Sequence, residues 1–214
     1  GNGGGTSAAR LPDVEHLADS ISSIQVVNIG TEIAEITIYY YDMLGTLVTE
    51  IDDTVDPSGS KTYLPIHPAV GFDGSAIIEY TGEVAALANF NYLDPLTASS
   101  YHGFPEGNGD LVFPLIMKDN NFNDTTFNVQ NVTGSPVDIL IEFIPEPGAG
   151  YDDTIPDIAD TLPAWSAHGY DQRTLAGFAG VGKWVGSASV TVVGEGDIVG
   201  VAQQIDSERD TATA

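Results

Sequence analysis

One pattern occurs twice in this chain, first at Ser22–Tyr41 and again at Thr125–Ile144. In each copy an apolar run reaches an asparagine, Asn28 or Asn131, breaks at a turn that contains glycine, and resumes as a strict alternation. Alternation with a period of two puts every second side chain on one face of a β-strand. The alternating apolar positions are Ala34, Ile36, Ile38 and Tyr40 in the first copy and Val137, Ile139, Ile141 and Phe143 in the second. The repeat therefore predicts the same β-hairpin in two modules.

The repeat extends beyond this hairpin and sets the expected domain boundaries. The further matches are Leu11-Pro12 with Phe113-Pro114, Gly74–Ala76 with Gly186–Ala188, and Val84–Asn89 with Ile198–Gln203. We expect an all-β fold of two tandem immunoglobulin-like antiparallel β-sandwich domains, with about seven strands and roughly 100 residues each. The expected division is a flexible N-terminal tail or linker segment at 1–10, module 1 at 11–100, a linker at 101–112, module 2 at 113–206 and a C-terminal tail at 207–214.

The repeated motifs resemble tandem immunoglobulin-like β-sandwich modules of secreted and cell-surface proteins of prokaryotes. The motifs that carry the resemblance are Gln25–Asn28 with Asn128–Asn131 and the two Gly-Ser-Ala strands at Gly74 and Gly186. The resemblance implies a fold and an extracellular or cell-surface location, and it implies no active site.

The charge of the chain limits its partners. Six lysines and arginines stand against 31 aspartates and glutamates, which gives a formal net charge of −25. Nucleic acid and anionic lipid surfaces would be repelled. No apolar run approaches the roughly 20 residues of a membrane helix, so we expect no membrane insertion. The chain has no cysteine, so a disulfide framework is excluded.

Two acidic stretches suggest a calcium site, although no cofactor is otherwise indicated. The candidate ligands are Asp119, Asn121, Asn123, Asp124, Asp152 and Asp153. Calcium prefers oxygen ligands of this kind. The alternative is an ordinary polar turn, because asparagine and aspartate are also favoured in turns for local hydrogen bonding.

Asn123 and Asn131 each begin an Asn-x-Thr pattern, which is the acceptor pattern for N-glycosylation. Asn131 occupies the position of Asn28, which has no such pattern. Its first role is therefore expected to be capping of a turn, and glycosylation is the better expectation at Asn123.

No catalytic constellation stands out, and we expect no enzyme activity. The four histidines, His16, His67, His102 and His168, lack the paired spacing of a zinc site. Ser166, His168 and Asp171 lie close in sequence, but a hydrolytic triad is assembled across a fold. Trp165 and Trp184 are candidates for a sugar-stacking platform, or for aromatic residues of the core or of a module interface.

The equal modules favour a structural function. The N-terminal tail has the composition of the linker between the modules, which suggests a non-enzymatic extracellular subunit that polymerises head to tail into a filament or sheath. The expected assembly residues are Gly1, Asn2, Gly3, Gly4, Gly5, Thr211, Ala212, Thr213 and Ala214. The expected partners are copies of the chain itself, with glycans or other surface proteins as further candidates. The alternative function is an adhesin or a pair of carbohydrate-binding modules within a larger surface protein.

Overall fold

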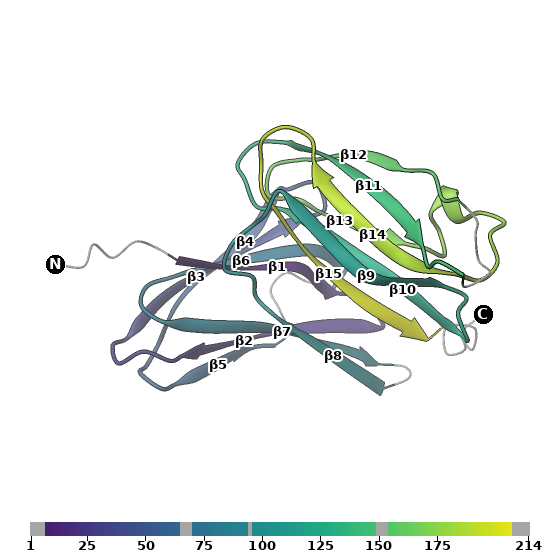
Figure 1. Cartoon of the computed structure of the whole chain (residues 1–214). Coiled ribbons are helices and arrows are strands. Elements are labelled where there is room, and N and C mark those ends of the chain that lie inside the picture. The colour runs from purple at the N-terminus through teal and green to yellow at the C-terminus, as the bar shows by residue number, and fades with distance from the viewer. Residues whose placement is uncertain (1–6, 65–69, 94–95, 149–153, 207–214) are drawn as a thin grey trace. The chain divides into compact units, whose positions relative to one another are not determined.

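The computed structural model describes residues 7–64, 70–93, 96–148 and 154–206, and within them the protein is an all-β fold of antiparallel sheets (Figure 1). The chain divides into two compact units. Unit 1 comprises residues 1–107 with Trp165–Ala167, and unit 2 comprises residues 108–164 with 168–214. The calcium expectation for Asp152 and Asp153 and the assembly expectation for residues 1–5 and 211–214 lie outside the described residues.

Unit 1 is a two-layer sandwich. Its strands are β1 (Ser7–His16), β2 (Ser20–Asn28), β3 (Ala34–Asp42), β4 (Leu47–Val55), β5 (Ser60–Tyr63), β6 (Phe72–Tyr80), β7 (Val84–Leu93) and β8 (Leu96–His102). One layer has the order β4-β3-β6-β1 and the other β5-β2-β7-β8, and the two join where His16 of β1 pairs with Ile21 of β2. The buried side chains of Ile24, Ile38 and Ile78 pack in the core between the layers.

Unit 2 repeats this arrangement. Its strands are β9 (Asp110–Lys118), β10 (Asn123–Asn131), β11 (Val137–Pro145), β12 (Ile158–Leu162), β13 (Ala167–Asp171), β14 (Trp184–Val192) and β15 (Ile198–Asp206), with a short 3₁₀ helix η1 (Ala176–Phe178). The layers have the orders β12-β11-β14-β9 and β13-β10-β15. Each strand from β9 to β15 therefore takes the place of the strand from β1 to β7 in unit 1. The predicted alternation is confirmed, because Val137, Ile139 and Ile141 are all buried.

The first strand of each unit carries the same β-bulge. In β1 the bulge lies between Leu11 and Val14 and includes Pro12; in β9 it lies between Phe113 and Ile116 and includes Pro114. A bulge tolerates a proline because the extra residue leaves the hydrogen-bond ladder.

A glycine stands opposite each bulge and is required by a close backbone contact. A Cβ atom on Gly74 would lie 2.1 Å from the carbonyl oxygen of Tyr41, and one on Gly186 would lie 2.2 Å from that of Ile144. The glycine of the Gly-Ser-Ala motif is therefore required where the sixth strand pairs with the end of the third.

The expected module boundaries differ from the strands that form. β1 begins at Ser7, inside the expected tail, because Ser7–Leu11 pair with Ala76–Tyr80. The expected linker at 101–112 is also partly strand, since β8 extends to His102 and β9 begins at Asp110. Composition alone indicated a linker, whereas pairing with a distant strand decides the structure.

The sheet orders also differ from the expected immunoglobulin order. In an immunoglobulin domain the first, second, fourth and fifth strands share a sheet. In unit 1 the first, third, fourth and sixth strands share one, because β1 lies beside β6 along most of its length. The antiparallel sandwich was predicted correctly, but the first, fourth and seventh strands do not lie in the sheets that the immunoglobulin order gives them.

Candidate functional site

A polar cluster joins the two layers of unit 1 at their outer strands. Asp53 of β4 accepts hydrogen bonds from Lys61 and Tyr63 of β5, with the lysine nitrogen at 2.6 Å and the tyrosine hydroxyl at 3.0 Å. The backbone N–H of Thr54 donates to the same carboxylate at 2.8 Å. β4 and β5 belong to different layers, so the hydrogen bonds of this carboxylate connect the two layers at the edge that these outer strands form.

Unit 2 contains the same cluster with a histidine in place of the lysine. Asp160 of β12 lies 2.9 Å from Nδ1 of His168 and accepts a 2.8 Å hydrogen bond from the Tyr170 hydroxyl, both on β13. The backbone N–H of Thr161 donates to it at 2.8 Å. We call the Asp53–Lys61–Tyr63 and Asp160–His168–Tyr170 clusters the two clamps.

The hydrogen bonds of the clamps govern their electrostatics. The hydrogen bond from Lys61 is the main reason that the pKa of Asp53 is lowered. Burial raises the pKa of Asp160, but the hydrogen bonds from His168, Tyr170 and the Thr161 backbone outweigh it, so this pKa is also lowered. Burial and the adjacent carboxylates raise the pKa of Tyr63 and Tyr170. Each clamp is thus a carboxylate held ionised between a nitrogen donor and a neutral phenol.

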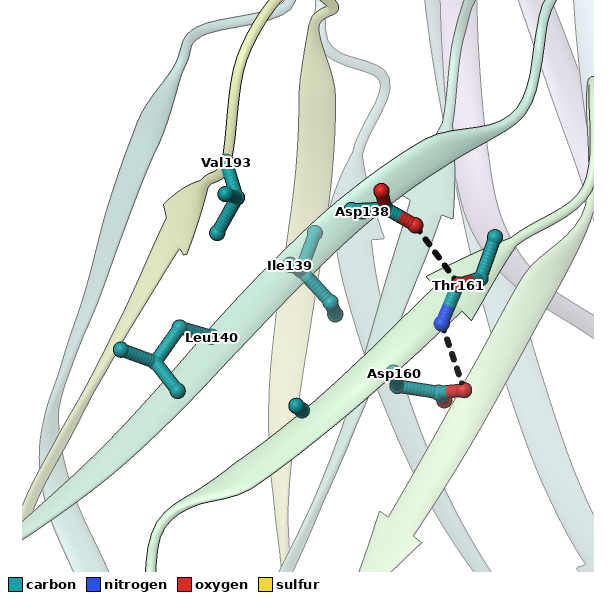
Figure 2. A pocket seen from close by; sticks show the side chains of 7 residues that line it. Asp138, Ile139, Leu140, Asp160, Thr161 and Val193 are labelled. Atoms are coloured by element: carbon teal, nitrogen blue, oxygen red, sulfur yellow. Dashed lines mark hydrogen bonds between the residues drawn. The ribbon is translucent and has the colours of Figure 1, made fainter.

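The clamp of unit 2 lies beside a shallow groove on β11 and β12. The groove is lined by Asp138, Ile139, Leu140, Ala159, Asp160, Thr161 and Val193. Figure 2 shows Thr161 between two carboxylates: its hydroxyl donates to Asp138 at 2.6 Å while its N–H donates to Asp160. Both carboxylates therefore accept hydrogen bonds from the protein itself. This arrangement favours a structural role, in which the carboxylates hold the strands together, over a binding or catalytic site.

The clamps were missed at the sequence level, although the sequence contains their signal. The segments DTVDPSGSKTY at Asp53–Tyr63 and DTLPAWSAHGY at Asp160–Tyr170 have the same length, with Asp-Thr first and tyrosine last. From the sequence, His168 was a candidate as one of four histidines for a zinc site and as a neighbour of Ser166 and Asp171, but not as a partner of Asp160. Asp171 instead pairs with Arg173 at 2.8 Å, and Ser166 is buried.

Four of the candidate calcium ligands lie in and beside the tight turn between β9 and β10. Asp119 and Asn121 have positive φ values of 48° and 52°. The buried carboxylate of Asp124 accepts the N–H of Asp119 at 2.8 Å, and the Asn123 amide donates to the Asn121 carbonyl at 3.0 Å. These side chains hold the turn itself, as in the polar-turn interpretation, and within the described ranges no three histidines, aspartates or glutamates are grouped to hold a metal. Asp152 and Asp153 lie outside the described residues.

The buried side chains of Asn28 and Asn131 stabilise equivalent turns through hydrogen bonds to backbone carbonyls. The Asn131 amide nitrogen donates to the carbonyls of Ser135, Leu162 and Pro163 at 2.8, 3.1 and 2.9 Å. Asn28 makes the matching bonds to Glu32 and Val55. Both side chains are buried, so the expected capping role is confirmed, and the folded protein has no space for a glycan at Asn131.

The tryptophans have different environments. Trp184 is fully buried and packs edge-on against Phe143 and Phe178, with ring centroids 6.2 and 5.4 Å away. It is a core residue, which excludes it from a sugar platform in the folded protein. Trp165 is half-buried and has a φ of 65°.

The segment that links the units hydrogen-bonds to both of them. On the unit 1 side, Phe104 exchanges two backbone hydrogen bonds with Arg10 at 2.9 and 3.0 Å, and Gly103 donates to Ala86 at 2.8 Å. On the unit 2 side, Asn108 exchanges two 2.9 Å bonds with Ile198. In the segment at 103–109, which we call the joint, residues 103 and 104 are therefore bonded to unit 1 and residue 108 to unit 2.

The comparisons with known proteins give no family. No family model matches the chain, and no curated protein matches it. Among solved structures, Thermotoga maritima 1070 is similar over 50% of this chain and 97% of its own, with 17% identity and a TM-score of 0.42. The vicilin from Solanum melongena is similar over 95% of this chain and 75% of its own, with 9% identity and a TM-score of 0.26. The described residues contain no helix with the length and apolarity to cross a membrane.

Proposed function

We propose that the protein is a non-enzymatic extracellular structural subunit that polymerises head to tail into a surface filament or sheath. The observation that supports this most is the joint, whose backbone hydrogen-bonds to Arg10 in unit 1 and to Ile198 in unit 2. The units share one strand order, so unit 2 of one molecule can be followed by unit 1 of the next as the units follow each other in the chain. Such a heterologous contact does not close on itself and produces a fibre.

The charge and the surface of the chain are consistent with this proposal. Large apolar side chains are exposed on both units, among them Leu44, Val70, Val112 and Phe122. With a net charge of −25, like molecules repel each other at low salt, so assembly should increase with ionic strength. The tandem-module resemblance and the extracellular location belong to the same proposal.

The test is assembly of the native chain and of a chain that lacks residues 1–6. Removal of these residues keeps β1 intact, because the strand begins at Ser7. We expect the full chain to form concentration-dependent oligomers in sedimentation velocity and fibres in negative stain at high salt, and the shortened chain to remain a folded monomer. A full chain that remains monomeric under these conditions would contradict the proposal, and binding to a polysaccharide by that monomer would favour the adhesin alternative.

A further inference from the structure

One outer face of unit 1, on the layer that β5, β2, β7 and β8 form (Figure 1), is free of acidic and basic side chains at its described outward positions. Side chains alternate along a strand, and Ile24, Ala88 and Tyr63 pack in or against the core. The outward positions are therefore every second residue of 21–27, 60–64, 85–91 and 98–102, counted from the first of each range. None of these is aspartate, glutamate, lysine or arginine. We call this surface the neutral face.

The other outer face of unit 1, on β4, β3 and β6, is acidic. β3 alternates between buried and outward side chains, and the outward Tyr39 has Glu50 as its partner on β4. In the next outward row Thr37 lies between Asp52 and Glu79. Unit 1 thus gathers acidic side chains on one face and keeps them off the other. Depletion of charged side chains is typical of the centre of an interaction surface.

The neutral face offers amide groups to a ligand. Gln25 of β2 and Asn89 and Asn91 of β7 point outward and are half-buried. An amide side chain both donates and accepts hydrogen bonds. Asn89 donates to the hydroxyl of Ser23 and Asn91 to the carbonyl of Ile21, at 3.4 Å in each case, which is longer than an ordinary N–H···O bond. These amides can therefore bond to a ligand with little loss of internal hydrogen bonding.

The composition and charge of this surface favour one class of partner. Protein interfaces are anchored mostly by tryptophan, tyrosine, methionine and arginine, and the outward positions named above contain none of these. An anionic polymer is repelled by the net charge of −25, whereas a cationic polymer is drawn to the acidic face. A neutral polysaccharide is subject to neither effect, and its hydroxyl groups can pair with the amides.

We propose that the neutral face binds a neutral polysaccharide, which lies along β7 and bonds to Asn89, Asn91 and Gln25. The half-buried Leu87 lies between Gln25 and His102 in one cross-strand row and provides apolar surface for a sugar ring. This inference goes beyond the proposed function, because it concerns a ligand of unit 1 whether or not copies of the chain assemble.

Affinity electrophoresis of the full chain tests the proposal. The net charge of −25 drives the chain through a native gel, and a polysaccharide embedded in the gel retards a protein that binds it. At low salt, where mutual repulsion disfavours assembly, we expect retardation by at least one of hydroxyethylcellulose, galactomannan and dextran. Carboxymethylcellulose has the same backbone as hydroxyethylcellulose but is anionic, and we expect it to cause no retardation.

Substitutions locate the binding surface. The Asn89→Ala, Asn91→Ala double variant is expected to raise the dissociation constant about tenfold, through the loss of two hydrogen bonds. Gln25→Ala on the neighbouring strand tests the same face with a single change. The Thr37→Ala, Thr54→Ala double variant on the acidic face is the matched control and is expected to bind as the native chain does. Thermal unfolding by circular dichroism verifies that every variant is folded.

The possible failures are distinct. Absence of retardation by all three neutral polysaccharides overturns the proposal, and equal weakening in the control variant overturns the location. Equal retardation by carboxymethylcellulose contradicts the preference for a neutral ligand. If the Asn89→Ala, Asn91→Ala variant instead loses the oligomers of the native chain, the face joins two copies and the polysaccharide is the wrong partner. A chain that assembles without binding contradicts this inference alone, and one that binds without assembling contradicts the proposed function alone.

Discussion

Glu15 and Asp73 face each other as a cross-strand pair on β1 and β6. The corresponding pair in unit 2 is Met117 and Val185, both of which are buried. Burial is the main reason that the pKa of Glu15 is raised, and the charges of Asp73 and Asp19 raise it further. Desolvation also raises the pKa of Asp73. Unit 1 thus places two like charges where unit 2 has an apolar contact.

The substitution Glu15→Gln should stabilise the protein at pH 7. A carboxyl whose pKa is raised in the folded state binds more protons folded than unfolded, so stability decreases as the pH rises from its ordinary value through the raised one. Removal of one charge of a directly opposed pair is expected to raise the free energy of unfolding by about 0.5 kcal/mol. Urea unfolding at pH 7 and pH 4 measures this, with the gain expected at pH 7 and lost at pH 4.

The control for this prediction is Glu35→Gln on β3, where the side chain is exposed. A gain of equal size from Glu35→Gln would indicate a general effect of the net charge of −25 and would contradict the role of the pair.

The substitutions Gly74→Ala and Gly186→Ala should each strongly destabilise one unit. The new Cβ would lie 2.1 or 2.2 Å from a backbone carbonyl oxygen, and backbone cannot move aside as a side chain can. Overpacking of this kind costs about 3 kcal/mol. Gly182→Ala is the matched control, since no atom lies within 4 Å of its Cβ position. Thermal unfolding by circular dichroism measures all three, and an equal loss in Gly182→Ala would show that the close contact is not the cause.

The substitution Asn131→Asp should destabilise unit 2 more than any surface change. It removes the amide hydrogens that three carbonyls accept and buries a carboxylate among those oxygens. Loss of such buried partners costs about 3 kcal/mol. Chemical unfolding followed by the fluorescence of the buried Trp184 reports on this unit. Stability within error of the native chain would disprove the role assigned to Asn131, and Asn121→Asp, in the turn between β9 and β10, is the exposed control.

The strands were predictable from sequence where the signal is local. The alternation at Ala34–Tyr40 and Val137–Phe143 determines which side chains enter the core, as expected. The expected hairpins are wrong, because β2 and β3, like β10 and β11, lie in different layers and pair with other strands. The order of the strands was not predictable, because it depends on pairing between distant segments. Ser7–Leu11 has the composition of a linker end and becomes a strand only because Ala76–Tyr80 offers an edge to it.

In the candidate site, too, the local features were predictable from the sequence and the contacts between distant segments were not. Asparagine at Asn28 and Asn131 indicated a capped turn, but the bonds to Val55 and Leu162 connect strands that are far apart in sequence. The clamps escaped notice because Lys61 and His168 are different residue types. Only the alignment of both eleven-residue segments reveals that each places a nitrogen donor opposite an aspartate.

The clamp of unit 2 should tolerate exchange of its nitrogen donor and fail without its carboxylate. His168→Lys installs the residue found in unit 1 and is expected to change the free energy of unfolding at pH 7 by less than about 0.5 kcal/mol. Asp160→Asn removes the negative charge and one of the two oxygens that accept from His168, Tyr170 and Thr161, and is expected to cost about 1 kcal/mol. Because the pKa of Asp160 is lowered in the folded state, its contribution is present above the ordinary aspartate value and disappears as the pH falls through the lowered one. The loss caused by Asp160→Asn should therefore shrink in urea unfolding below pH 4, whereas Asp157→Asn, an exposed neighbour, should show no loss at either pH. A loss that persists unchanged at low pH would mean that the carboxylate charge does not hold β12 to β13.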